Sequence, residues 1–194
     1  MNRASSYLPD GASADVFIGL GSNQGHRIAA LQRAVNRLGG VHGIEVAAVS
    51  PVYEAEAHVW PGAEPQPDHL NAVVHVRTQR SPEALFSKLQ CLEGEAGRIQ
   101  NAPKWSPRPL DLDLLLFGDQ SVEIVCGDAD NLIVPHPRMA ERRFVLRPLA
   151  DLVHNLVVPG ADGATVSDLL ERCLDTKRVE RTWLRLVDDP RPRP

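Results

Sequence analysis

The chain has 194 residues, of which 43% are hydrophobic and 24% charged, and its formal net charge is -4. This composition is typical of a folded globular protein and argues against a disordered or fibrous one. A negative net charge disfavours a general nucleic-acid binder or a protein of acidic membranes, because both partners select basic surfaces. No apolar run is long enough for a membrane span and the first residues lack the layout of a secretory signal, so we expect a cytoplasmic protein.

The expected domain organisation is simple. We expect one domain over residues 14–187, between a flexible segment at 1–13 and a flexible tail at 188–194, because small polar residues or Pro and Arg dominate the ends. The three cysteines are widely separated, which argues against a zinc site or a disulfide framework. We expect a monomer or weak homo-oligomer.

Hydrophobic periodicity predicts the elements of the first half. An apolar run predicts a strand over 16–20, and apolar residues at helical spacing predict a helix that ends at Gly39 and Gly40. Two strands follow, over 46–53 and 72–78, and the second alternates apolar and polar residues.

The segment between those strands, 57–68, collects proline and glycine and is predicted to be an irregular loop. A helix is expected from Ser81, as its cap, to Ala96, followed by a strand over 110–117. Strand, helix, two strands, helix, strand is the order of a ferredoxin-like α+β sandwich, in which helices cover one face of an antiparallel sheet. The opposite face is then free to bind a ligand.

The last third is less regular. After Gly118 we expect a hairpin, an acidic turn at 128–131 and helices over 140–146 and 166–174. The segment 181–187 fits either a strand or a frayed helix. A further prediction is a capping box formed by Thr165 and Asp168 at the start of the last helix.

Two carboxylates, Asp111 and Asp113, lie within the apolar strand over 110–117. Alternation places both on one face, with Cα atoms about 6.6 Å apart at about 3.3 Å per residue. Neighbouring carboxylates on a half-buried surface repel each other, and Mg²⁺ relieves this repulsion when it is shared with water and substrate phosphates. Arg108 and Lys104 lie close enough in sequence to hold a triphosphate beside such an ion. The alternative interpretation is a solvated Asp-x-Asp pair on an exposed strand.

Six segments resemble, in order and at similar spacing, the family of 6-hydroxymethyl-7,8-dihydropterin pyrophosphokinases. They are Phe17 to Asn23, Ser50 to Glu54, Leu70 to Val74, Trp105 to Gly118, Val134 to Pro137, and Arg142 to Leu149. The resemblance implies a ferredoxin-like fold and a transferase of folate biosynthesis. Such an enzyme moves the β,γ-diphosphate of ATP to the pterin hydroxymethyl oxygen and leaves AMP and the pterin diphosphate.

The resemblance also implies roles for individual residues. Asp111 and Asp113 would hold two Mg²⁺ ions, with Arg98 and Arg108 completing the catalytic set. The residues matching the family's ATP-binding positions are Gln90, Glu93, Arg98, Lys104, Trp105, Arg108, His136 and Arg142. Those matching its pterin-binding positions are His69, Asn71, Trp105 and Phe144. Both partners of the protein would therefore be small molecules.

The chain departs from the family pattern at several positions. Ser106 stands where Gly or Ala is usual, and Gln100 stands where some members carry another arginine, which would weaken the hold on phosphate. His69 replaces a larger aromatic residue at one stacking position. The segment 55–57 lacks the usual Thr-Pro pattern, and the loop that follows is longer than in compact members.

Two other functions remain open from the residues alone. Nucleotidyltransferases also place Asp-x-Asp on a strand with two metal ions, but they release pyrophosphate, and their Gly-Ser turn closely precedes the carboxylates. Here Gly21 and Ser22 lie far upstream. A regulatory module of ferredoxin-like fold is the second alternative, because a fold does not determine a function.

Overall fold

The computed structural model describes residues 12–59, 64–99, 106–126 and 130–187. Its elements follow one another as β1 (Ala14–Ser22), α1 (Arg27–Gly39), β2 (Ile44–Val49), β3 (Tyr53–Ala55), β4 (His69–Thr78), α2 (Pro82–Glu95), β5 (Asp111–Phe117), β6 (Val122–Cys126), β7 (Asp130–Val134), the short 3₁₀ helix η1 (Met139–Glu141), α3 (Arg143–Val153), α4 (Val166–Arg172) and β8 (Val179–Arg181). Within these ranges no helix is long and apolar enough to cross a bilayer.

The main sheet is antiparallel, with β1 in a central place between β5 and β4. β4 then pairs with β2 along one half of its length and with β3 along the other half, and β8 adds to the edge of β3. β6 and β7 form a separate hairpin, as expected from the sequence. The order of strands and helices confirms the ferredoxin-like prediction.

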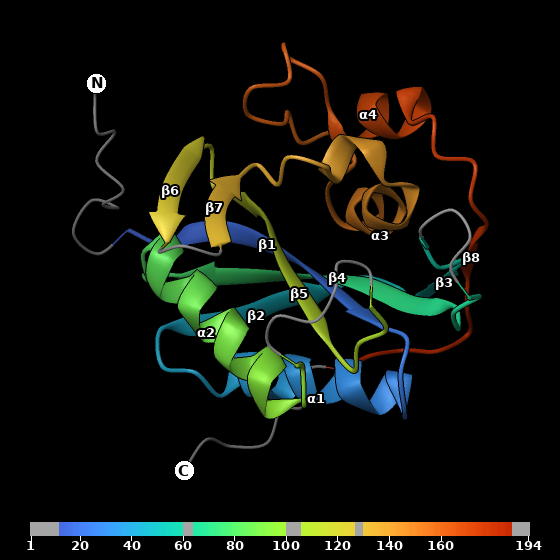
Figure 1. Cartoon of the computed structure of the whole chain (residues 1–194). Helices are drawn as coiled ribbons and strands as arrows, with labels where there is room; N and C mark the ends of the chain where they lie inside the picture. The colour runs from blue at the N-terminus through green and yellow to red at the C-terminus, as the bar shows by residue number, and fades with distance from the viewer. Residues whose placement is uncertain (1–11, 60–63, 100–105, 127–129, 188–194) are drawn as a thin grey trace.

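Helices α1 and α2 cover one face of this sheet and lie below it in Figure 1. Alternate residues of β1, such as Val16 and Ile18, point into a core with apolar residues of both helices, including Leu31 and Leu85. Burial of such apolar side chains is the main source of stability in a fold of this kind. This layer therefore anchors the strands that carry the site.

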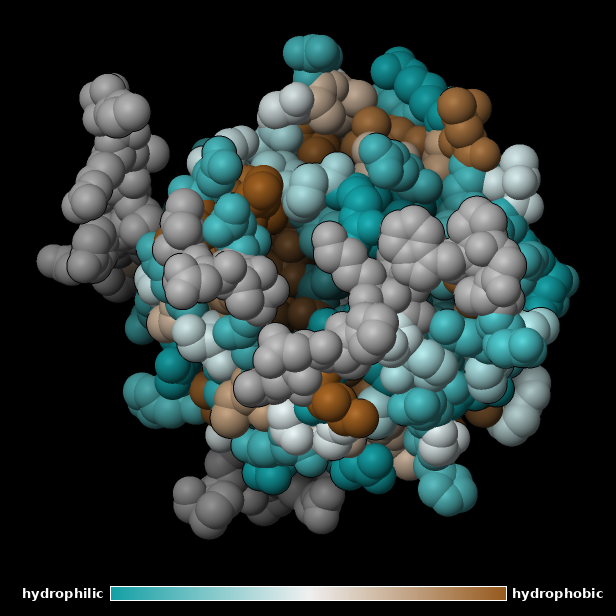
Figure 2. Space-filling model, in the orientation of Figure 1, coloured by the Kyte–Doolittle hydropathy of each residue, from teal (hydrophilic) through white to brown (hydrophobic). Residues whose placement is uncertain are grey.

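The opposite face has a second, smaller core beneath the C-terminal additions α3 and α4 (Figure 1). Phe17 and Val73 from the sheet meet Leu146 and Leu149 of α3 in this core. Hydrophilic side chains predominate on the surface shown in Figure 2, and hydrophobic areas lie near α4 and beside β7. α3 thus covers part of the sheet face that was predicted from the sequence to be free for a ligand.

Element boundaries differ from the prediction at Ser50 and Pro51, where one strand expected over 46–53 is divided into β2 and β3. The Ser50 hydroxyl accepts a hydrogen bond from the backbone N–H of Val73 at 2.9 Å, while proline has no N–H for a sheet ladder. The chain therefore leaves the ladder before β3 rejoins β4.

The C-terminal third also differs in detail. The helix expected over 140–146 is a 3₁₀ turn followed by α3, which continues past Pro148 to Val153. The capping box of Thr165 and Asp168 is confirmed at the start of α4. Of the ambiguous segment 181–187, only Arg181 belongs to a strand, as the last residue of β8. The expectations for 1–11, 188–194 and the first two residues of the acidic turn, 128–129, lie outside the described residues, and 130–131 belong to β7.

Candidate active site

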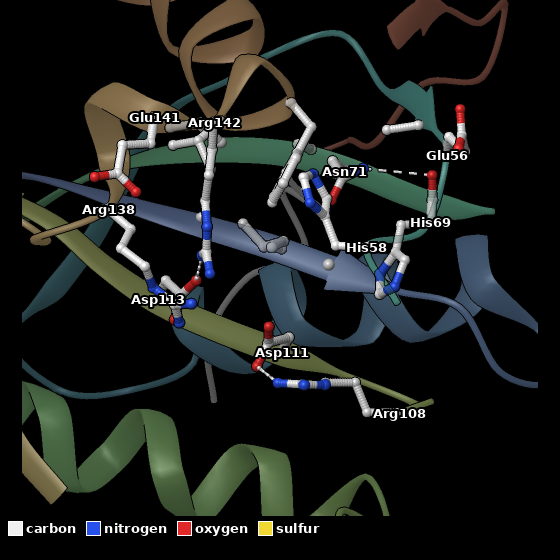
Figure 3. A pocket seen from close by; sticks show the side chains of 18 of the residues that line it. Glu56, His58, His69, Asn71, Arg108, Asp111, Asp113, Arg138, Glu141 and Arg142 are labelled. Atoms are coloured by element: carbon white, nitrogen blue, oxygen red, sulfur yellow. Dashed lines mark hydrogen bonds and ion pairs between the residues drawn. The ribbon is translucent and has the colours of Figure 1, made fainter. Parts of the chain in front are cut away.

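A cavity of about 380 Å³ lies between the sheet and the beginning of α3. Figure 3 shows its two ends. The charged end contains Asp111 and Asp113 on β5 with the arginines around them, and the ring end contains His69 and Asn71 on β4 with the neighbouring His58. One continuous pocket therefore joins an ionic site to a site lined by planar groups.

The two carboxylates of β5 lie on the cavity face of the sheet, as alternation predicts. Leu112 between them is buried on the opposite face, where it belongs to the core under α1 and α2. Gly21 of β1 pairs with Asp111 and Gly19 pairs with Asp113. Because glycine has no side chain, the floor beside the carboxylates stays open.

Asp111 is compensated by two guanidinium groups. Its Oδ1 atom lies 2.9 Å from Nη1 of Arg98 and 2.9 Å from Nη1 of Arg108. Burial by itself raises the pKa of Asp111, but Arg108 and Arg98 together outweigh burial and hold the pKa below its ordinary value. Asp111 is therefore ionised in the protein without bound ligands.

Asp113 is more weakly compensated. The nearest cationic group in the described ranges is Nη1 of Arg142 at 3.7 Å, and Nε2 of His136 lies at 3.9 Å. Burial and the nearby Asp111 carboxylate raise the pKa of Asp113 to about 6, against the opposing effect of Arg142. The pKa of His136 is lowered to about 4, first by burial and then by Arg142, so its imidazole is neutral near pH 7. The charge of an ionised Asp113 is therefore only partly neutralised by its neighbours, and the site can accept a cation there.

Glu93 on α2 connects the helix layer to this end of the cavity. Its Oε1 atom accepts a hydrogen bond from the backbone N–H of Leu112 at 2.8 Å and also contacts Arg98. Burial raises the pKa of Glu93 to about 7, and Asp111 and Asp113 add to the shift. Glu93 thus fixes Arg98 and the strand from below the sheet.

Asn23, just after β1, positions the backbone of Arg108. The side-chain Oδ1 atom of Asn23 accepts a hydrogen bond from the backbone N–H of Arg108 at 2.8 Å, and the backbone N–H of Asn23 donates to the carbonyl of Arg108 at 3.2 Å. The amide of Asn23 also reaches Gln66 and Pro67 in the loop before β4. The turn after β1 therefore holds two loops that border the cavity.

The ring end is built by β4 and α3. Asn71 is 5% exposed, and its amide donates weakly to the carbonyl of His69 at 3.4 Å. Burial lowers the pKa of His69 to about 4, so its ring is neutral near pH 7. Phe144 also lines the cavity, and the guanidinium of Arg142 lies 5.6 Å from its ring centre. An amide and planar rings in one cavity suit a flat heterocycle with adjacent donors and acceptors.

Comparison with known proteins then identifies the family. Residues 17–154 match the family described as 7,8-dihydro-6-hydroxymethylpterin-pyrophosphokinase (HPPK), which is well over half of the chain. The chain belongs to this family.

Relatives named 2-amino-4-hydroxy-6-hydroxymethyldihydropteridine pyrophosphokinase support the HPPK assignment. The protein of Synechocystis sp. is 40% identical over 80% of this chain and 74% of its own length. The protein of Pseudomonas aeruginosa is 38% identical over 81% of this chain and 91% of its own length.

Longer proteins also match. The chain is 35% identical to the Pneumocystis carinii "Folic acid synthesis protein fol1" and spans 22% of that protein. A crystal structure of Plasmodium falciparum HPPK-DHPS superposes with a TM-score of 0.66 at 12% identity, over 88% of this chain and 47% of that one, and it shows a shared fold.

The structure gathers most of the residues that the resemblance to HPPK singled out. Arg98, Arg108 and Arg142 surround the carboxylates, with Glu93 and His136 next to them. Gln90 differs, because it is exposed on α2 and does not line the cavity. Lys104 and Trp105 lie outside the described residues.

Some cavity residues were missed by sequence reasoning. Arg138, just before η1, and Glu141, its last residue, reach the charged end. Glu56 and His58 reach the ring end from the loop after β3. No local pattern marks these four positions, because each belongs to a connection whose path depends on packing. The sheet residues differ, since alternation alone could have placed Gly19 and Gly21 on the carboxylate face.

The donor set fits magnesium. Among the described residues no group of three or more His, Cys, Asp or Glu side chains is arranged to hold a metal ion. Asp111 and Asp113 offer two carboxylates, and Mg²⁺ is commonly bound by one or two carboxylates together with water and substrate phosphates. The site therefore fits an ion that arrives with a polyphosphate better than an ion enclosed by protein.

Proposed function

We propose that this protein transfers the diphosphate of ATP to 6-hydroxymethyl-7,8-dihydropterin. The observation that carries the proposal is the continuity of one cavity. Asp111, Asp113 and four arginines lie at its charged end, while Asn71 and Phe144 lie at its ring end. A triphosphate and a flat heterocycle could thus meet in one space.

The reaction is a displacement at the β-phosphorus. The hydroxymethyl oxygen of the pterin forms a bond to this phosphorus, and the bond from the β-phosphorus to the oxygen bridging it to the α-phosphorus breaks. That oxygen leaves as part of AMP, and the hydroxyl proton passes to solvent. Catalysis of such transfers depends on positioning the reactants and stabilising the phosphate charge.

We assign the charged end to the triphosphate and its cations. Asp111 and Asp113 would hold Mg²⁺, with two ions as the proposed number, and the bound ions would neutralise phosphate charge. Arg98 and Arg108 now share one oxygen of Asp111. When a cation binds that carboxylate, both guanidiniums become available to phosphate oxygens, to which arginine binds with directed hydrogen bonds. The proposed ATP-binding set adds Gln90, Glu93, Lys104, Trp105, His136 and Arg142.

We assign the ring end to the pterin. The side-chain amide of Asn71 would pair with the heterocycle, and Phe144 would stack on it from α3. The neutral ring of His69 would face the other side, with Trp105 as a further proposed contact. A neutral imidazole stacks on an electron-poor heterocycle without adding a buried charge.

The proposal is tested by the products. Purified protein with ATP, Mg²⁺ and the hydroxymethyl pterin is expected to form AMP and pterin diphosphate in equal amounts, measured by chromatography. Asp111→Ala and Asp113→Ala should each lower kcat by at least about a thousandfold, since charge stabilisation is often the largest catalytic contribution. Pyrophosphate release would instead indicate a nucleotidyltransferase, and unaltered turnover in both variants would refute the metal assignment.

A further inference from the structure

Asp175 lies after α4, outside the residues 17–154 that match the HPPK family, and its side chain is 6% exposed. Its Oδ2 atom accepts a hydrogen bond from the backbone N–H of Arg143 at 3.1 Å. Its Oδ1 atom accepts from the N–H of Lys177 at 3.1 Å. Asp175 therefore reaches across the fold to the first residue of α3.

This contact supplies a cap that α3 lacks locally. The residue before the helix, Arg142, makes no side-chain cap hydrogen bond. A carboxylate at a helix N-terminus satisfies a free N–H group and interacts favourably with the helix dipole. Asp175 takes this position from a distant part of the chain, so the beginning of α3 depends on the C-terminal segment.

The side chain of Arg143 closes the contact from the other side. Its Nε atom donates to the carbonyl of Asp175 at 2.9 Å, and its Nη2 atom donates to the carbonyl of Cys173 at 3.1 Å. Arg143 and Asp175 are thus joined by one hydrogen bond from backbone to side chain and another from side chain to backbone. The position of Asp175 against α3 is therefore fixed by several hydrogen bonds.

Asp175 also faces a wall of the cavity. The Nε2 atom of His58 lies 3.7 Å from Oδ2 of Asp175, is buried and makes no hydrogen bond to another described residue. The ring of His58 also packs against Phe144, with ring centres 5.5 Å apart and planes tilted by 55°. His58 and Asn71 both line the cavity (Figure 3). His58 thus contacts both Asp175 and the stacking residue of α3.

We propose that Asp175 is a positioning residue for the pterin end of the cavity. It sets the beginning of α3, which carries Phe144 into the cavity, and it holds His58 against that ring. Asp175 does not line the cavity itself, so it acts through these two residues. This inference rests on the proposed function, because it assigns the ring end to the pterin.

The test compares Asp175→Ala with Asp168→Ala, a matched control. Asp168 also caps a helix, because its Oδ2 atom accepts from the N–H of Thr165 at 2.8 Å, but α4, which is described in full, presents no residue to the cavity. Both variants lose a carboxylate cap, and a loss of thermal stability is expected in both. Only Asp175→Ala is expected to change the pocket.

We expect Asp175→Ala to raise KM for the pterin about tenfold, while KM for ATP changes less than twofold and kcat less than threefold. Binding of the pterin in the presence of a nonhydrolysable ATP analogue, followed by pterin fluorescence, should weaken by the same factor. Asp168→Ala should leave both KM values within twofold of wild type. Asp175→Asn should lie between wild type and Asp175→Ala, because its amide oxygen still accepts hydrogen bonds without the charge.

The proposal is overturned if Asp175→Ala keeps the wild-type KM for the pterin, or if kcat and both KM values change together as in a general loss of folded protein. If Asp175→Ala does not fold, Asp175→Asn decides, and a pterin KM within 1.5-fold of wild type refutes the inference. Failure of wild-type protein to form AMP from the pterin would instead refute the proposed function.

Discussion

Glu93 on α2 accepts a hydrogen bond from the backbone N–H of Leu112, which lies between the two acidic residues of β5. The same carboxylate oxygen contacts Arg98, and Arg98 contacts Asp111. A residue from the helix layer thus reaches past the edge of β5 and orders a cationic group on the ligand side. The support of the charged end therefore comes from both faces of the sheet.

We predict that Glu93→Ala lowers the free energy of unfolding by about 1 to 3 kcal/mol, because the buried N–H of Leu112 loses its acceptor. Arg98 also loses its support, so kcat/KM for ATP should fall about tenfold or more. Urea unfolding and initial-rate kinetics measure the two effects. Ser87→Ala, at a position of the same helix that does not line the cavity, is the control and should change neither quantity by a comparable amount. Wild-type stability in Glu93→Ala would contradict this account.

Neutralising either of the two carboxylates of β5 should change the stability of the ligand-free protein, in opposite directions for the two residues. Because the folded-state pKa of Asp113 is raised to about 6, its contribution to stability is fully present below about pH 4 and is lost as pH rises through 6. Asp113→Asn should therefore stabilise the ligand-free protein at pH 8, by about 1 to 2 kcal/mol after allowance for solvent screening, and should have no effect at pH 4. The variant should still lose turnover.

Asp111→Asn provides the matched comparison. The pKa of Asp111 is lowered in the fold, despite its burial, by Arg108 and Arg98, so its ionised form contributes stability that is lost as pH falls. This variant should destabilise the ligand-free protein at pH 8. Thermal unfolding at both pH values measures the pair, and destabilisation by both variants at pH 8 would contradict the assigned difference.

His69 should make the ligand-free protein sensitive to mild acid. Burial lowers its folded-state pKa to about 4, so the neutral ring is favoured in the fold and stability is lost as pH falls below about 6.5. The expected loss from this residue is about 2 kcal/mol between pH 7 and pH 5. His69→Gln should remove that part of the pH dependence in urea unfolding. His154→Gln, at an exposed position, should not, and parallel curves for wild type and His69→Gln would refute the prediction.

Gly21→Ala tests the floor of the cavity. A Cβ atom there would lie 3.5 Å from Oδ1 of Asn71 and 3.6 Å from Cβ of Asp111, which is ordinary contact, so the variant should fold with stability within about 1 kcal/mol of wild type. The methyl group would occupy space beside Asn71, and KM for the pterin should rise at least about fivefold.

Gly94→Ala is the control for that substitution, because a Cβ atom added at this position of α2 would have no described neighbour within 4 Å. Alanine favours a helix interior by about 1 kcal/mol over glycine, so this variant should be slightly more stable and equally active. A Gly21→Ala protein with unchanged pterin KM would show that the floor near Asn71 does not contact the substrate.

The sequence was most informative where local periodicity and local charge coincide. Asp111 and Asp113 could be placed on one face by alternation, and Arg108 lies three residues away and pairs with Asp111. Connections set by long-range packing could not be predicted in this way. The division of one expected strand at Ser50 depends on a hydrogen bond to β4, and the contact of Asp175 with α3 spans 32 residues.

The irregularity in the pairing of β1 with β5 has a consequence for how this protein can vary. The register shifts between Phe17 and Ile18, so that Leu115 and Leu116 both pack in the core under α3, while Asp111 and Asp113 keep the cavity face. The extra residue of β5 is accommodated at this point, so the loss of one residue between Asp113 and Leu116 would make the pairing regular and leave both acidic side chains on the cavity face. A residue gained or lost between Asp111 and Asp113 would instead place the two carboxylates on opposite faces of the sheet. Homologous chains that retain this chemistry should therefore vary in length after Asp113 but not between the two acidic residues.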